Sequence, residues 1–257
     1  MVGGLEKFRE AFARFSDNFV IIGGTACDEV LAGTIMRPRP TLDIDIIVIV
    51  ENMTVDFAAA FWRFIAEGSY RPGIRKNNDG TPKYVLYSFD NGVAGYPVKI
   101  ELLSRHNDVF SNASHTEPLP IDGEVSSLSA IILDEPYYRL TVNNSFVNNG
   151  LRYASPVALA ALKARAYLNL LSERENGHHI NTKDILKHRN DVLKLAATMT
   201  PGEFTEVDPT VVATVNEFSE KLLASLPNQS LSDAMRANEE TLRLYLETLP
   251  TFYTAAE

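Results

Sequence analysis

Residues 19–50, FVIIGGTACDEVLAGTIMRPRPTLDIDIIVIV, are the stretch that decides the fold. The stretch opens with four apolar residues typical of a strand, breaks at Gly23-Gly24, and continues into a segment that favours a helix over residues 25–31. A second apolar strand follows, in which Asp43 and Asp45 stand two residues apart. Side chains two apart on a strand point to the same face, so the pattern predicts both carboxylates on one side of a sheet.

Two carboxylates in an aliphatic strand are unfavourable unless a cation lies between them. Mg²⁺ prefers oxygen ligands and is commonly held by one or two carboxylates together with substrate phosphates. Glu101 interrupts a later apolar strand and would supply a third carboxylate. Three such groups can bind two metal ions, one activating an attacking hydroxyl and one stabilising the leaving phosphate oxygens. The alternative for Asp43 and Asp45 is an edge strand with one solvated face.

Gly23-Gly24-Thr25 connects the predicted strand to the predicted helix. The first turn of a helix presents unpaired backbone N–H groups and a partial positive charge, and glycine lets an anion approach the backbone closely. The turn is therefore a candidate phosphate-binding site. Glycine pairs also join strands to helices for purely structural reasons, and the three residues alone do not separate these alternatives.

Composition narrows the function classes. The chain has 257 residues, of which 45% are hydrophobic, and a single cysteine, Cys27. This excludes an internal disulfide framework and suits a reducing compartment. No signal-peptide pattern and no run of some eighteen apolar residues occur, so we expect a cytoplasmic, non-membrane protein.

The net charge of −9 disfavours an extended nucleic-acid duplex as a partner, because many phosphate contacts require a basic surface. A short nucleic-acid end could still be bound by a local basic strip made of Arg37, Arg39, Arg71, Arg75, Lys76 and Lys83.

The rest of the chain divides into a mixed half and a helical half. Hydrophobic periodicity predicts helices at 3–16 and 56–67, strands at 84–89 and 98–103, and short strands near 129–133 and 139–142. From Ser155-Pro156, a favourable helix start, the pattern is helical, with further helices expected at 182–198, 209–226 and 230–249. We expect an α/β domain over residues 1–150 and a helical domain over residues 151–257.

The glycine turn, the Thr-x-Asp-x-Asp strand and the later acidic strand together resemble the nucleotidyltransferase superfamily of DNA polymerase β type. Within it, GGTA followed by RPTLDIDIIV is similar to the AbiEii-type abortive-infection toxins. The resemblance implies an α+β fold with a mixed β-sheet, flanking helices and a C-terminal helical bundle. It makes Asp43 and Asp45 metal ligands and Glu101 the third acid, which would deprotonate the incoming hydroxyl. The triphosphate would contact Gly23, Gly24, Thr25 and Thr41.

The helical half is similar to the same family in ASPVALAALKARAYLNLL and NTKDILKHRNDV. The resemblance makes Lys163 a nucleotide contact and places Lys183-Asp184 at the start of the next helix. From the residues alone, Lys163 beside an apolar helix stripe would more commonly be a surface side chain, and Asp184 would serve the N-terminal turn of its helix.

The resemblance implies transfer of a nucleoside monophosphate from a nucleoside triphosphate to an acceptor hydroxyl, with Mg²⁺ or Mn²⁺ as cofactor. The acceptor would be an RNA end such as that of tRNA, a protein or a small molecule, and an antitoxin would be a further partner if the chain is a toxin of a toxin–antitoxin system. Two alternatives stay open. One is a nucleotidyltransferase-like module that only binds or regulates, and the other is an aminoglycoside-type adenylyltransferase.

Overall fold

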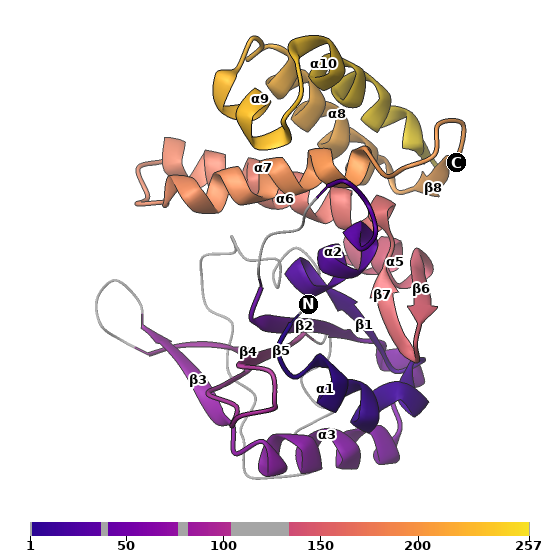
Figure 1. Cartoon of the computed structure of the whole chain (residues 1–257), viewed down its shortest axis with the longest axis vertical. Coiled ribbons are helices and arrows are strands. Elements are labelled where there is room, and N and C mark those ends of the chain that lie inside the picture. Colours follow the sequence, from indigo (N-terminus) through magenta and orange to yellow (C-terminus); the bar gives the residue numbers. More distant parts are fainter. Residues whose placement is uncertain (1, 37–40, 77–81, 104–133, 257) are drawn as a thin grey trace. The chain divides into compact units, whose positions relative to one another are not determined.

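A computed structural model describes residues 2–36, 41–76, 82–103 and 134–256 (Figure 1). The described residues form two compact units. The first unit consists of the described residues within Met1–Glu29, Arg39–Val125 and Ser145–Ala154. The second consists of those within Val30–Pro38, Ser126–Asn144 and Ser155–Glu257. Within the described part of the chain, no helix has the length and apolar character needed to cross a membrane.

The first unit is built on a mixed seven-stranded sheet, so the expected α+β class is confirmed. β1 is antiparallel to β2 and parallel to β7, whereas β2 is parallel to β5. In spatial order the strands are β3 (Arg71–Lys76), β4 (Pro82–Asp90), β5 (Lys99–Leu103), β2 (Asp43–Val48), β1 (Phe19–Ile22), β7 (Leu151–Ala154) and β6 (Ser145–Asn148).

One face of this sheet carries an aromatic core. Helices α1 (Leu5–Phe12) and α3 (Val55–Glu67) lie beside each other on it, as Figure 1 shows. Their apolar stripes meet strand side chains in a network of tilted, edge-to-face and stacked ring pairs, with centroids 4.4–6.4 Å apart. The rings belong to Phe8, Phe12, Phe19, Phe57, Phe61, Phe64 and Phe89.

The opposite face is apolar at one end and polar at the other. Val20, Ile47 and Leu103 are buried there, each with at most 3% of its surface exposed. Toward the end where β1 passes into helix α2 (Gly23–Leu31), the same face carries the acidic positions of β2 and β5. The alternation of buried and half-buried residues along both strands follows the period of two that the sequence predicts.

The second unit is mainly helical. α6 (Pro156–Glu175) begins after Ser155, whose side chain caps it as predicted, and packs against α7 (Thr182–Ala196) (Figure 1). Its other described helices and strands include α5 (Glu135–Asn143), α8 (Pro209–Leu223), α9 (Gln229–Met235), α10 (Glu239–Thr248), the short 3-10 helix Leu249–Phe252 and the strand pair β8 (Thr205–Val207) and β9 (Tyr253–Ala255).

Two predicted elements are wrong. The expected strand at 139–142 lies inside α5, where Pro136 occupies the first turn and the buried Thr141 hydroxyl donates to the Tyr137 carbonyl. The expected helix over 230–249 is two helices, because Arg236 takes a left-handed conformation (φ 51°) that ends α9 and Asn238 caps a new one. The predicted strand at 129–133 lies outside the described residues, and the predicted boundary at residue 150 falls in the turn between β6 and β7.

Candidate functional site

The three predicted acids share one face of the sheet in the first unit. Asp45 on β2 stands directly opposite Glu101 on the parallel strand β5, and Asp43 stands opposite Lys99. Residues paired in this way point to the same side, as do residues two apart on a strand. The backbone therefore brings Asp43, Asp45 and Glu101 together as predicted, and all three are half-buried.

Lys99 belongs to the same cluster. Its ammonium donates to the Glu101 carboxylate in an ion pair whose side chains are 20% and 14% exposed. Asp90 on β4 stands opposite Lys99, so this cation lies in a row between two acidic positions. This acidic face of the sheet therefore carries one cation of the protein itself, which is paired with Glu101.

The donor chemistry of this face matches Mg²⁺ or Mn²⁺, but the side-chain positions do not form a complete ligand set. Among the described residues, no group of three or more His, Cys, Asp or Glu side chains is arranged to hold a metal ion. One carboxylate oxygen of Glu101 is paired with the Lys99 ammonium. The strand register brings the three acidic positions to one face, but the side chains as they stand do not form a metal-binding group.

The glycine turn lies against the acidic strand. Gly23 has φ 67°, a left-handed conformation, and a Cβ built on it would collide with the Asp45 carboxylate. A Cβ on Gly24 would come within 2.7 Å of the Thr41 hydroxyl oxygen. Little room is therefore left for a side chain at either glycine, and of the predicted triphosphate contacts Gly23 lies against Asp45 while Gly24 lies against Thr41.

Thr25 has a structural contact. Its hydroxyl donates to the Asp43 carbonyl at 2.6 Å, and the residue is 2% exposed. This bond ties the first turn of α2 to the start of β2 and fixes the glycine turn relative to the acids. The Thr25 hydroxyl proton is thereby occupied within the protein.

Lys163 lies in the second unit and is buried, so the interpretation of it as a surface side chain is wrong. Its ammonium donates to the Asp191 carboxylate at 2.8 Å, and the two side chains are 1% and 5% exposed. Asp184, which is half-buried, accepts from Lys187 at 2.9 Å. Lys163 as a nucleotide contact stays a prediction.

Sequence reasoning missed Lys99, Asp90 and Asp191. Lys99 had a signal, because it precedes Glu101 by two residues in a strand and so shares its face. Asp90 is followed by Asn91-Gly92, a pair typical of a turn, and this hides its position as the last residue of β4. Nothing in the local pattern pairs Asp191 with a lysine 28 positions earlier. Of the predicted basic strip, Arg37 and Arg39 lie outside the described residues, and Arg71 is exposed on β3.

Comparison of the chain with family models, with curated proteins and with solved structures gave no match in any of the three searches.

Proposed function

We propose that this protein transfers a nucleoside monophosphate from a nucleoside triphosphate to an acceptor hydroxyl, in a metal-dependent reaction. One observation carries the proposal: Asp43, Asp45 and Glu101 emerge on one face of adjacent strands, immediately beside a strand–helix turn of two tightly packed glycines. Such a turn offers backbone N–H groups to phosphates. The acids beside it offer the oxygen ligands that bind phosphate-bound Mg²⁺.

The position of Asp45 is the reason for proposing a metal. Its carboxylate contacts Gly23, so a phosphate bound to this turn would lie next to a negative charge. A cation between them removes the repulsion. In the proposed reaction Asp43 and Asp45 would hold this cation, and the Gly23-Gly24 turn would position the β- and γ-phosphates.

Glu101 then acts as the base. It accepts the proton of the acceptor hydroxyl as the oxygen bonds to the α-phosphorus, and the bond to the β-phosphate oxygen breaks to release pyrophosphate. When bound, the metal stabilises the negative charge that develops on the phosphate oxygens. For this role the Glu101 carboxylate must leave Lys99, whose ammonium stays on the same face as a partner for anionic substrate.

The proposal is tested with Asp43→Asn combined with Asp45→Asn. We expect the double variant to lose transfer of label from α-³²P-labelled nucleoside triphosphates to RNA, to the protein itself or to aminoglycosides, with an unchanged circular dichroism spectrum. Asp56→Asn, an exposed change in the first turn of α3, is the matched control and should keep transfer. Transfer that survives the double change would refute the metal assignment.

The Lys99–Glu101 ion pair favours a second candidate, a nucleotidyltransferase-like module that binds nucleotide without turnover. A carboxylate paired with an internal cation is less available to a metal ion or to a substrate hydroxyl. Calorimetry with Mg²⁺ and each of the four common ribonucleoside triphosphates separates the two functions. Binding that yields no product with any acceptor supports the second, and product formation supports the first.

A further inference from the structure

Arg189 on α7 carries a buried positive charge in the second unit, where the residue is 5% exposed. Its guanidinium donates from Nε to the Asn190 amide oxygen at 3.0 Å and from a terminal nitrogen to the Ser230 hydroxyl oxygen at 3.4 Å. Both acceptors are neutral. No carboxylate in the described ranges forms an ion pair with Arg189, so its hydrogen bonds leave the charge itself uncompensated.

An uncompensated buried arginine is unfavourable. Arginine stays protonated in proteins and cannot lose the charge. Burial lowers the pKa of the Arg189 guanidinium, as expected for a cation removed from water. The same helix shows the more common solution at Asp191, which neutralises the buried Lys163. Arg189 therefore favours an anion that the unmodified chain does not place beside it.

Ser230 connects this buried charge to the surface. The residue belongs to α9 and is exposed, whereas Leu231 next to it is buried. An enzyme can reach an exposed hydroxyl, and a group attached to the Ser230 oxygen would stand beside the Arg189 guanidinium.

A phosphate ester is the modification that fits these contacts. It carries a charge of about −2 at pH 7 and three strong acceptor oxygens, and a guanidinium matches two of these oxygens with parallel hydrogen bonds. We infer that Ser230 is a phosphorylation site and that Arg189 binds the phosphate, which supplies the counter-charge that no described side chain provides.

The phosphoryl donor is a nucleoside triphosphate bound to a protein kinase. The Ser230 oxygen bonds to the γ-phosphorus, and the bond from this phosphorus to the β-phosphate oxygen breaks. Nucleoside diphosphate leaves, and the hydroxyl proton passes to a base of the kinase. This step is independent of the transferase activity proposed above.

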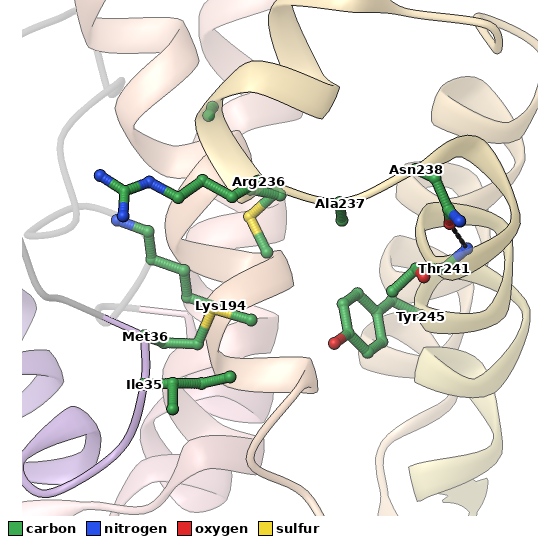
Figure 2. A pocket seen from close by; sticks show the side chains of 10 residues that line it. Ile35, Met36, Lys194, Arg236, Ala237, Asn238, Thr241 and Tyr245 are labelled. Carbon is green, nitrogen blue, oxygen red and sulfur yellow. Dashed lines mark hydrogen bonds between the residues drawn. The ribbon is translucent and has the colours of Figure 1, made fainter.

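The phosphate would hold α9 on α7 at the start of α9. The two helices contact each other, and the opposite end of α9 reaches a cavity of about 640 Å³. Figure 2 shows this cavity between α7, the segment that connects α9 to α10, and α10, with Arg236 on its wall. Phosphorylation of Ser230 therefore restrains a helix that forms part of this wall.

The test uses the full chain with phosphoserine incorporated at position 230 through an expanded genetic code. A ³¹P NMR titration follows the second ionisation of the phosphate, whose ordinary pKa is about 6. We expect pairing with Arg189 to lower this pKa to about 5, and Arg189→Gln to return it to about 6. The phosphate should also raise the melting temperature by about 2–4 °C, and this rise should be absent in Arg189→Gln.

Arg189→Gln removes a buried charge that has no counter-charge, so the unmodified variant should keep or raise its melting temperature. Arg189→Met, which replaces the charge by an apolar side chain, is a second variant with the same expected results. Phosphoserine at position 232 is the matched control, because Ser232 is the other serine of α9 and has no hydrogen bond to Arg189. Its phosphate pKa should not change in Arg189→Gln.

Two measurements separate a covalent phosphate from a free one. Mass spectrometry of the chain isolated from the cells that produce it should find phosphate on the peptide that contains Ser230. An NMR titration of the unmodified chain with inorganic phosphate should show no binding at Arg189. The inference is overturned if Ser230 carries no phosphate in those cells, if neither Arg189 variant changes the phosphate pKa at position 230, or if inorganic phosphate binds Arg189 without modification.

Discussion

Two lysine–carboxylate pairs, one in each unit, show how burial changes what the same chemistry does. Lys163 and Asp191 lie between α6 and α7, with side chains 1% and 5% exposed. Lys99 and Glu101 lie on the polar end of the sheet, with side chains 20% and 14% exposed. Water is nearly excluded from the first pair and reaches the second.

The difference in exposure to water determines which of the two ion pairs can open to bind a ligand. Separating the buried pair would leave a charge in apolar surroundings, so Lys163 and Asp191 are held to each other. Separating the pair on the sheet exposes each group to water at a much smaller cost, so a ligand can replace either partner. We expect the helical pair to act in stability and the sheet pair to act in binding.

The largest expected effect is at Asp191. Asp191→Asn leaves Lys163 buried without its counter-charge and should lower the free energy of unfolding by about 3–5 kcal/mol. Urea denaturation followed by circular dichroism measures the change. Asp184→Asn, which removes an i,i+3 partner of Lys187 at a more exposed site, is the matched control and should cost less than about 1 kcal/mol. Equal losses for the two variants would contradict the role given to burial.

Replacing both members of the buried pair sharpens this comparison. Lys163→Met combined with Asp191→Leu removes both charges and keeps apolar volume, so it should restore most of the stability lost in Asp191→Asn. The same denaturation curves provide the measurement. A double variant as unstable as the single one would mean that the pair contributes through geometry that apolar side chains cannot replace.

The next largest effect is expected at the glycine turn. Gly23→Ala places a Cβ in a left-handed conformation, at about 1–2 kcal/mol, and displaces the Asp45 carboxylate at a further cost of order 1 kcal/mol. Gly33→Ala is the control, because its φ is 78° and nothing lies within 4 Å of an added Cβ. Gly23→Ala should lower the unfolding free energy more than Gly33→Ala, and the excess measures the clash with Asp45. Adding Asp45→Ala to Gly23→Ala should remove this excess.

Lys99→Gln should affect binding more than stability. The free energy of unfolding is expected to fall by about 1 kcal/mol or less, because both partners remain accessible to water. Affinity for Mn²⁺ should rise about thirtyfold, since the repulsion between one positive charge and a divalent ion about 4 Å away in water-like surroundings is roughly 2 kcal/mol. Calorimetric titration with MnCl₂ tests this. Weaker Mn²⁺ binding in the variant would mean that Lys99 supports the site.

The smallest effect is expected at a fully exposed acid. The hydrogen bond that Asp208 accepts from the Thr210 N–H holds the pKa of its carboxyl below the ordinary value. Its stabilising contribution is therefore present above the unfolded-state pKa, about 3.9, and is lost as the pH falls through the lower folded-state pKa. The stability difference between the wild type and Asp208→Ala should shrink over this acidic range. A difference independent of pH would show that the carboxylate charge has no part in capping α8.

The sequence predicts well those elements whose pattern is local. The four apolar residues before Gly23 predict β1. The alternation of acidic and apolar residues from Asp43 onward predicts β2 and its polar face. Asp45 can stand opposite Glu101 only if their two strands are neighbours in the sheet. The family resemblance implies that they are neighbours, whereas composition does not. The predicted site residues on the sheet are therefore close to one another, as expected.

Other features depend on contacts between distant residues and could not be predicted. β6 and β7 are four residues each, and β7 joins the sheet through β1, more than a hundred residues earlier. In the sequence, Lys163 is surrounded by the apolar residues of its own helix. Its partner Asp191 comes close only because α7 packs against α6, which the sequence pattern does not show. The strand predicted at 139–142 failed because the run Arg-Leu-Thr-Val is too short to separate a strand period from a helix period, and Pro136 just before it favours a helix start.

The return of the chain to β7 has a practical consequence for dissecting the protein. A truncation after residue 144 would leave one side of β1 as an unpaired edge, a template for self-association through backbone hydrogen bonds. A truncation after residue 150 would add only β6, which reaches β1 through the missing β7. A soluble fragment that retains the acidic cluster must therefore extend at least to Ala154.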